Sequence, residues 1–198
     1  MERDCTITAM RKSLVIVLAM ALPISAVAKH PPALKRYASK ECGISFSYPA
    51  AWKVTAGREH CSVVLVSTTK HRDPELDLDP ITVTSGTGSF DEAADGAGFY
   101  KPRKGDEGLT LTEKEHIGEW MFNAGQVPAV AEPLKVGEFS GLEAWASSRC
   151  YHPGGGYAGQ CDYIAAFVAH DGRWIAAQGH DEDFILKLLG TAVFDAGR

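Results

Sequence analysis

No hydrophobic run in this sequence is long enough to span a membrane. The apolar run Leu14–Leu22 has nine residues, whereas a helix that crosses a hydrocarbon layer of ~30 Å needs about 20. The sequence also lacks a basic excess, with 20 Lys and Arg against 25 Asp and Glu and a formal net charge of −5. We therefore expect no stable membrane anchor and no nucleic-acid partner. The mild acidity equally disfavours anionic membrane surfaces.

The short apolar run has the features of a signal peptide. Basic residues precede it, Pro23 ends it, and Ala26-Val27-Ala28 supplies the small-x-small pattern read by signal peptidase. No cysteine follows at the cleavage site, which argues against a lipid-anchored lipoprotein. We predict cleavage after Ala28 and a periplasmic or secreted protein that begins at Lys29. Acidic residues before Met10 are unusual in a signal peptide, so both Met1 and Met10 are candidate starts.

The sequence has no C-x-x-C pair, the common spacing of structural zinc ligands. Four cysteines follow the signal peptide, and an even number in an exported chain indicates disulfides. Of the three possible pairings we favour Cys42–Cys61 and Cys150–Cys161, because each closes a local loop between candidate strands. Each disulfide would contribute about 3 kcal/mol. A zinc site made by all four cysteines is the alternative.

Internal repeats and low-complexity segments are also absent. Signal peptide 1–28 is followed by a polar, proline-containing lead-in at 29–40 and by one domain at 41–198. A chain of this length can bury roughly 70% of its unfolded surface as a single domain.

The first part of the domain predicts strands. Ile44, Phe46 and Tyr48 alternate with serines, the period of a half-buried strand. Pro49 cannot donate to a ladder and ends that strand, and Trp52 begins the next. We expect these two strands to form the first hairpin of the core, with the aromatic side chains facing inwards. Further strands are expected at Cys61–Ser67, apolar on both faces as a central strand would be, and at Ile81–Ser85.

Three helices are predicted from their caps. Ser89 and Glu92 form a capping-box pattern, and Thr112 with Glu115 repeats it before the apolar residues Ile117, Trp120 and Met121. Pro128 and Pro133 bound an irregular stretch. Asp181 is the expected cap of the last helix, whose core-facing stripe is Phe184, Ile185, Leu188 and Leu189.

The last third predicts hairpins. Leu134–Val136 and Leu142–Ala146 flank a turn, and Ala144–Tyr151 and Cys161–His170 flank a glycine-rich loop. Asp171-Gly172 is a two-residue turn signal before Arg173–Gln178. The order of elements indicates an α+β fold, a mostly antiparallel sheet with helices packed on it.

A resemblance to a known family is carried by the first strand pair. The residues Gly43, Ile44, Ser45, Phe46, Tyr48, Pro49, Trp52, Lys53 and Val54 resemble the start of PsbP-like domains. The late hairpin, the helix Asp183–Leu189 and a short strand near Ala192–Phe194 are similar in order. The resemblance implies a PsbP-like α/β/α sandwich, shared with Mog-type Ran-binding proteins, and a non-enzymatic binding role. It places no functional residue on this chain, and the four cysteines are not part of the family pattern.

Other motifs have simpler explanations than chemistry. Gly86-x-Gly88 lies between a strand and a helix, but Asp91 stands where a dinucleotide fingerprint has its third glycine, so we interpret it as a turn. An acidic loop offers possible calcium ligands, but Pro80 replaces a turn glycine and no glutamate closes the loop. We interpret it as a solvated loop. Its side chains are His71, Asp73, Glu75, Asp77 and Asp79.

Support for catalysis is weak. His152, His170 and His180 lack H-x-H or H-x-x-x-H spacing, although three imidazoles that converge could bind zinc or copper. There is no G-x-S-x-G nucleophile motif, and paired cysteines offer no thiolate. We therefore predict no enzymatic activity and no cofactor. The alternative is an exported enzyme or metal-binding protein that uses these histidines.

The glycine-rich loop at 153–159 is the most unusual stretch. Tyr157 lies within it, and tyrosine is a common binding anchor because it is amphipathic and has few rotamers. The plainer interpretation is a flexible hairpin end. We predict an exported, non-enzymatic binding or accessory protein that contacts another protein or a small ligand, with Tyr157 as the candidate contact residue.

Overall fold

The computed structural model describes residues 33–68, 80–125, 127–152 and 154–195. The predicted signal peptide and the acidic loop from His71 to Asp79 therefore lie outside the described residues. The described residues belong to one unit, Pro32–Arg198.

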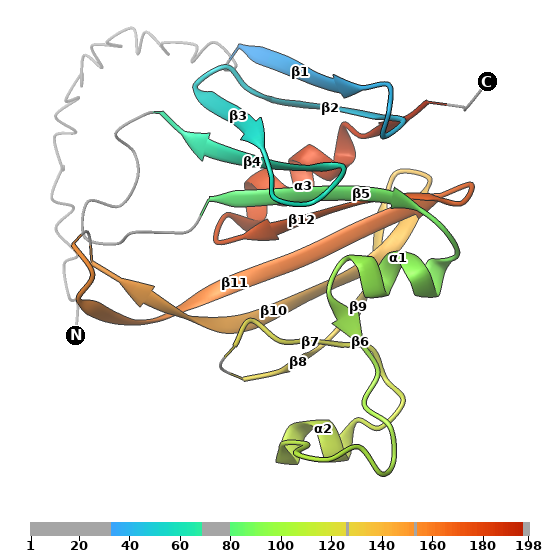
Figure 1. Ribbon diagram of the computed structural model, residues 1–198, viewed down its shortest axis with the longest axis vertical. Coiled ribbons are helices and arrows are strands. Elements are labelled where there is room, and N and C mark those ends of the chain that lie inside the picture. Colours follow the sequence, from blue (N-terminus) through green and yellow to red (C-terminus); the bar gives the residue numbers. More distant parts are fainter. Residues whose placement is uncertain (1–32, 69–79, 126, 153, 196–198) are drawn as a thin grey trace, which may run out of the picture. The chain divides into compact units, whose positions relative to one another are not determined.

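A seven-stranded antiparallel sheet forms the centre of this unit (Figure 1). Neighbouring strands pair in the order β3-β4-β5-β12-β11-β10-β9. Every pair in this order is antiparallel. The strands are β3 (Trp52–Ala56), β4 (Ser62–Ser67), β5 (Ile81–Thr87), β9 (Glu132–Val136), β10 (Phe139–Tyr151), β11 (Tyr157–His170) and β12 (Arg173–Gly179).

Two three-stranded sheets accompany the large one. The first has the order β1-β2-β13 and consists of β1 (Leu34–Ser39), β2 (Ile44–Pro49) and β13 (Val193–Phe194). The second has the order β6-β7-β8 and consists of β6 (Phe99–Tyr100), β7 (Met121–Phe122) and β8 (Ala129–Val130).

The helices are short, and each begins at a side-chain cap. Helix α1 (Phe90–Gly96) has the predicted capping box of Ser89 and Glu92. Helix α3 (Glu182–Gly190) begins after Asp181, whose carboxylate accepts a hydrogen bond from the backbone N–H of Phe184. Helix α2 (Leu111–Glu115) is the shortest. The expected stripe of α3 is buried, with exposures of 9% or less at Phe184, Ile185, Leu188 and Leu189.

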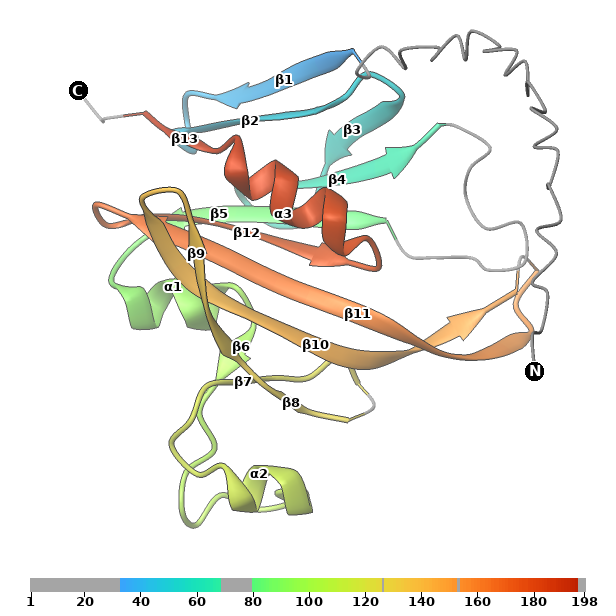
Figure 2. The ribbon, with the colours of Figure 1, turned by 180° about the vertical axis from the view of Figure 1, so that it is seen from behind.

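The large sheet has a hydrophobic core on each face. On one face, α3 and the β1-β2-β13 sheet pack on alternate residues of β4, β5, β11 and β12 (Figure 2). Phe46 and Leu65 are fully buried there. On the other face, α1 and the β6-β7-β8 sheet cover β10, β11 and β12. Phe99 and Phe167 meet in that second core, with ring centroids 5.6 Å apart.

The expected hairpin of the first two core strands is wrong. Strand β2 pairs with β1 and β13, while β3 pairs with β4 in the large sheet. Only Ala50 and Ala51 separate β2 from β3, and neither favours the positive φ angles that tight hairpin turns need. The chain therefore passes from one sheet to the other. The aromatic side chains do face a core, and Trp52 stacks on Phe184 with ring centroids 4.2 Å apart.

The polar lead-in was also assigned incorrectly where it is described. Residues 34–39 form β1, the strand partner of β2. Four of its six side chains are exposed, so the sequence shows no apolar alternation there. In the stretch bounded by Pro128 and Pro133, short strands β8 and β9 are present, and Pro133 is tolerated because β9 is an edge strand.

The second helix is shorter than predicted and begins earlier. Its capping box uses Thr110 and Glu113 instead of Thr112 and Glu115. The chain contains both T-x-x-E patterns, two residues apart, and the first one forms the box. Gly118, with φ of 83°, follows the helix, and Met121 belongs to β7. The fold is thus mostly antiparallel sheet with few helices, and it is richer in strand than a balanced α/β/α sandwich.

Candidate functional site

The β10–β11 hairpin is longer than the strands on either side of it. Strand β9 last pairs with β10 at Glu143, opposite Glu132. Strand β12 last pairs with β11 at Ile164, opposite Gly179. We call residues 145–163, which extend beyond both partners, the arm. Figures 1 and 2 show the arm as an orange hairpin that projects from the large sheet.

A disulfide joins the two strands of the arm. Cys150 and Cys161 are bonded, with Cα atoms 5.7 Å apart, and this confirms one predicted pair. The loop beyond it is a tight turn. The His152 N–H donates to the Gly156 carbonyl, and the Gly155 N–H donates to the His152 carbonyl. Gly154 and Gly155 have φ angles of 106° and 97°, which only glycine adopts without strain. The glycines therefore form a defined turn.

Exposed aromatic side chains lie along the arm. Tyr157 is 60% exposed, which confirms that it is a surface residue. Tyr151, directly opposite in the register, is 41% exposed, and the two rings meet edge to face with centroids 6.3 Å apart. Trp145 is 40% exposed. The prediction missed Tyr151 and Trp145 because both lie in a strand that was read as a core strand.

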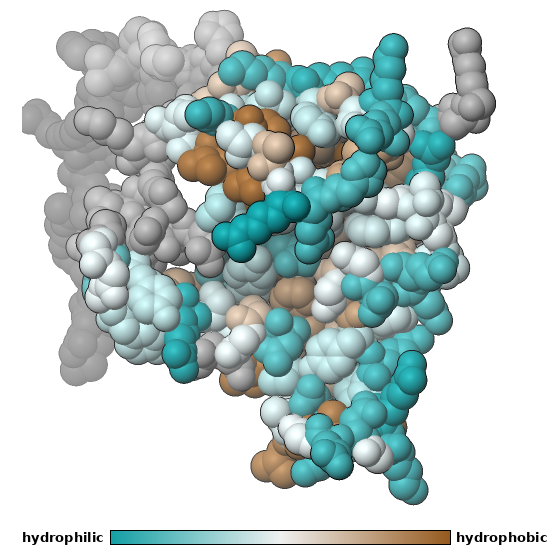
Figure 3. Space-filling model, viewed as in Figure 1, coloured by the Kyte–Doolittle hydropathy of each residue, from teal (hydrophilic) through white to brown (hydrophobic). Residues whose placement is uncertain are grey.

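The surface of the arm is neither strongly polar nor strongly hydrophobic. In Figure 3 the arm, at the left, has the pale colours of intermediate hydropathy, while brown hydrophobic surface gathers over β3 and β4. Tyrosine and glycine give this intermediate character. Such a surface suits contacts that form and separate in water, because tyrosine supplies contact area together with a hydroxyl.

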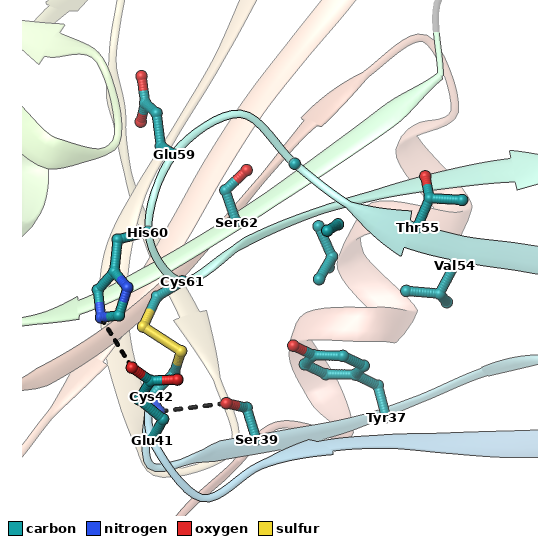
Figure 4. Close-up of a pocket in the computed structure, with 13 residues that line it drawn as sticks. Tyr37, Ser39, Glu41, Cys42, Val54, Thr55, Glu59, His60, Cys61 and Ser62 are labelled. Atoms are coloured by element: carbon teal, nitrogen blue, oxygen red, sulfur yellow. Dashed lines mark hydrogen bonds and ion pairs between the residues drawn. A yellow bond between two sulfur atoms is a disulfide. The ribbon is translucent and has the colours of Figure 1, made fainter.

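The second predicted disulfide, Cys42–Cys61, joins the two sheets at the other side of the molecule. Its Cα atoms are 5.5 Å apart. It connects the β1–β2 turn with the start of β4, and Figure 4 shows it at one end of a pocket. The pocket has a volume of about 470 Å³ and lies between β1 and the β3–β4 hairpin. Both pairs predicted from the sequence are therefore present.

The pocket beside Cys42–Cys61 has mixed walls. Tyr37, Val54 and Val63 line its apolar part, and Glu41, Glu59 and His60 line its polar part. His60 Nε2 lies 3.9 Å from Glu41 Oε1, with both side chains more than 70% exposed (Figure 4). Such an exposed pair contributes little to stability. The pocket could admit a small molecule, but no group of described residues in it has the donors of a metal site.

Three carboxyl groups have shifted pKa values, and hydrogen bonds from Ser89 lower that of Glu92. The hydroxyl of Tyr100 donates to Glu113 at 2.6 Å, and this bond, together with those from Thr110, lowers the pKa of Glu113. Burial and the same contact with Glu113 raise the pKa of Tyr100. Burial raises the pKa of Glu143 at the root of the arm, and the nearby Glu182 and Glu132 raise it further.

The three candidate histidines do not converge. His152 follows β10 at the tip of the arm, whereas His170 ends β11 at the opposite end of the hairpin. His180 lies between β12 and α3, and its Nδ1 is 2.6 Å from the carbonyl oxygen of Asp162. In the described ranges no cluster of three or more His, Cys, Asp or Glu side chains could hold a metal ion.

The Gly86-x-Gly88 motif is explained by packing. Any Cβ at Gly86 would lie 2.7 Å from the Trp174 ring. Gly88 has a φ of 149°, and its N–H donates to the Gly172 carbonyl. The motif therefore makes room for a tryptophan and forms a turn, as interpreted from the sequence. No helix in the described part of the chain is long and apolar enough to cross a membrane.

No family model and no curated protein matches the chain. Among solved structures it is similar to a protein from Bacteroides thetaiotaomicron VPI-5482, with a TM-score of 0.43 and 11% identity over 80% of this chain and 47% of that chain. It is also similar to cyanobacterial PsbP (CyanoP) from Synechocystis sp. PCC 6803, with a TM-score of 0.43 and 14% identity over 86% of this chain and 97% of that one. The chain thus spans less than half of the Bacteroides protein.

Proposed function

We propose that this chain is an exported, non-enzymatic binding protein that contacts a partner protein through the arm. The observation that carries the proposal is the arm itself, a two-stranded hairpin that extends beyond β9 and β12, its neighbours among the described strands. The arm is nonetheless held by a disulfide and bears exposed aromatic rings. An isolated hairpin is marginally stable in water. A disulfide that stabilises such a hairpin at the surface is consistent with a binding role for the hairpin.

The arrangement of the arm favours binding in a further way. The disulfide lies between the turn and the sheet, so the region around Tyr151 and Tyr157 is ordered before a partner arrives. Preorganisation lowers the conformational entropy that binding would otherwise remove. Interfaces are also enriched in tyrosine and tryptophan.

Export is the second part of the proposal. Disulfides persist in oxidising compartments such as the periplasm and the extracellular space, and this chain contains two. The predicted signal peptide agrees with this location. The proposal also places the chain among PsbP-like binding domains, on the resemblance of Gly43–Val54 to the start of that family.

The histidine-based alternative has less support. An enzyme or a metal-binding protein of that kind needs the imidazoles in one site, and His152 and His170 lie at opposite ends of one hairpin. We therefore propose neither a catalytic residue nor a cofactor.

Site-specific photo-crosslinking tests the proposal. A photoreactive phenylalanine analogue would replace Tyr157 in one variant and Leu111 in another. Leu111 is a matched control because it is 80% exposed but lies on α2, outside the arm. We expect a defined protein adduct from position 157 in cells that export the chain, and none from position 111. Adducts from position 111 alone, or from neither position, would contradict the proposal.

A further inference from the structure

The outer edge of β11 in the arm has backbone groups that no described residue pairs with. His170 and Arg173 flank the two-residue turn between β11 and β12, and residues that flank such a turn exchange both backbone hydrogen bonds. Even-numbered residues of β11 therefore direct their N–H and C=O groups towards β12. Because β12 ends opposite Ile164, the groups of Gln160 and Asp162 point to the same side but meet no strand among the described residues. The register shift between Cys150 and Tyr151 ends this alternation before Ala158.

An independent contact confirms this direction. His180, which follows β12, places Nδ1 2.6 Å from the carbonyl oxygen of Asp162. A carbonyl only accepts, so Nδ1 carries the proton in this bond. The bond ends the β12 side of the ladder. Beyond it, the N–H of Asp162 and both backbone groups of Gln160 have no partner in the described part of the chain.

Among the other outer strands, the three with five or more residues carry features that oppose pairing with a further strand. Strand β9 contains Pro133 and Lys135, β1 contains Lys35 and Arg36, and β3 contains Lys53. Charged side chains and prolines of this kind protect exposed edges. The β10 edge of the arm is interrupted by a bridge between Val127 and Ser147.

The β11 edge has fewer of these features, because Asp162 is its only charged side chain from Tyr157 to Tyr163. From Tyr157 to Tyr163 it contains no lysine, arginine or proline. It also adjoins the exposed Tyr157 ring, and the disulfide at Cys161 ties it to β10. An exposed edge without lysine or proline can serve as a template for an added strand.

We infer that the arm binds an extended polypeptide segment as an added strand along Tyr157–Tyr163 of β11. This inference rests on the proposed function and gives it a mode of binding. The occupant continues the position of β12 and pairs with both backbone groups of Gln160 and with the N–H of Asp162. The backbone supplies the hydrogen bonds, and side chains such as Tyr157 supply selectivity for the partner sequence.

A proline substitution separates this mode from other uses of the arm. Gln160→Pro removes an N–H that points outward, so the β10–β11 ladder keeps its own hydrogen bonds. Gln160→Ala is the matched control, since it removes the side chain and retains the N–H. The probe is a phage-displayed library of random twelve-residue peptides, selected on the disulfide-bonded wild-type protein in the presence of excess soluble Gln160→Pro protein.

The inference expects selected peptides that bind wild type and Gln160→Ala within twofold of each other and bind Gln160→Pro at least tenfold more weakly. It also expects the Gln160 and Asp162 amides of wild type to gain hydrogen-exchange protection when such a peptide binds, while the Cys161 amide, which faces β10, changes little. This second measurement needs no substitution and holds even if Gln160→Pro folds poorly.

Peptides that bind all three proteins equally, or that leave the Gln160 and Asp162 amides unprotected, would overturn strand addition. If peptides that are insensitive to Gln160→Pro still bind Tyr157→Ala more weakly than wild type, the arm remains a binding surface and only strand addition is wrong. If no peptide responds to either Gln160→Pro or Tyr157→Ala, strand addition is again rejected. The crosslinking at position 157 then decides the proposed function separately.

Discussion

The two disulfides close loops of similar size but hold very different structures. Cys42–Cys61 spans 19 residues and joins two sheets that share a core. Cys150–Cys161 spans 11 residues and joins neighbouring strands of the arm, which extends beyond the ends of β9 and β12. Chain-entropy arguments assign about 3 kcal/mol to each. The structural difference shows that loop length alone does not determine what a disulfide stabilises.

The consequence depends on what else holds the two ends. The sheet-joining disulfide adds to contacts in the main core, where Phe46 and Leu65 are fully buried. The arm disulfide supports a hairpin that can open locally while the rest of the sheet stays folded. We expect the first to affect global stability and the second to affect the order of a binding surface.

The largest expected effect is on the core that the sheet-joining disulfide adjoins. Phe46→Ala removes a fully buried ring and should lower the free energy of unfolding by about 3–5 kcal/mol. Trp52→Ala should fall near the lower end of that range, because Trp52 is only half-buried against Phe184. Chemical denaturation of both variants measures this. A tolerated Trp52→Ala would remove the main support for the family resemblance.

The next effect compares the two disulfides directly. Replacing Cys42 and Cys61 by serine should lower the free energy of unfolding by about 3 kcal/mol. Replacing Cys150 and Cys161 should lower it less, by about 1 kcal/mol, because the arm frays without the core. Amide exchange should then show lost protection confined to residues 145–163. Equal losses of global stability in both double variants would contradict the distinction between the two regions.

The sequence predicts some features of the fold and leaves others undetermined. Both cysteine pairs and the caps at Ser89 and Asp181 follow from local patterns. Strand β2 pairs not with β3 but with β1, whose mostly exposed side chains give no strand signal, and with β13, about 150 residues away.

The arm could be anticipated only in part. Tyr157 stands out because it lies among glycines, and it is exposed. The free edges of the hairpin were not predictable, because they depend on where β9 and β12 end opposite β10 and β11. Strand length read from one segment says nothing about the length of its partners.

A third region, the segment around α2, has no disulfide, and here we expect the ionised Glu113 side chain to stabilise the helix. Hydrogen bonds from Tyr100 and Thr110 lower the pKa of Glu113. The ionised form is therefore favoured in the folded state, and its stabilisation is present above the ordinary carboxyl pKa and lost as the pH falls below it. Amide protection of residues 111–115 should decrease between pH 6 and pH 3. Glu113→Gln should show the same low protection at both pH values.

A smaller effect is expected at the root of the arm. Burial, with Glu182 and Glu132 nearby, raises the pKa of Glu143, so its charge opposes folding at neutral pH. The folded state binds the proton more tightly, and stability is lost as the pH rises through the raised pKa. Glu143→Gln should increase the free energy of unfolding at pH 7 by about 0.5 kcal/mol. At a pH below the ordinary carboxyl pKa the two proteins should be equally stable.

The central claim is that the arm binds a partner protein. Its most direct test takes the partner that is crosslinked through position 157 and measures its affinity for two single variants of this chain. Tyr157→Ala should leave the free energy of unfolding within about 0.5 kcal/mol of wild type and weaken binding by about 1 kcal/mol or more. Leu111→Ala, at a position that is also exposed but lies outside the arm, should change neither quantity. Unchanged affinity for Tyr157→Ala, in a protein whose arm disulfide is intact, would contradict the account and leave the arm as a hairpin without a binding role.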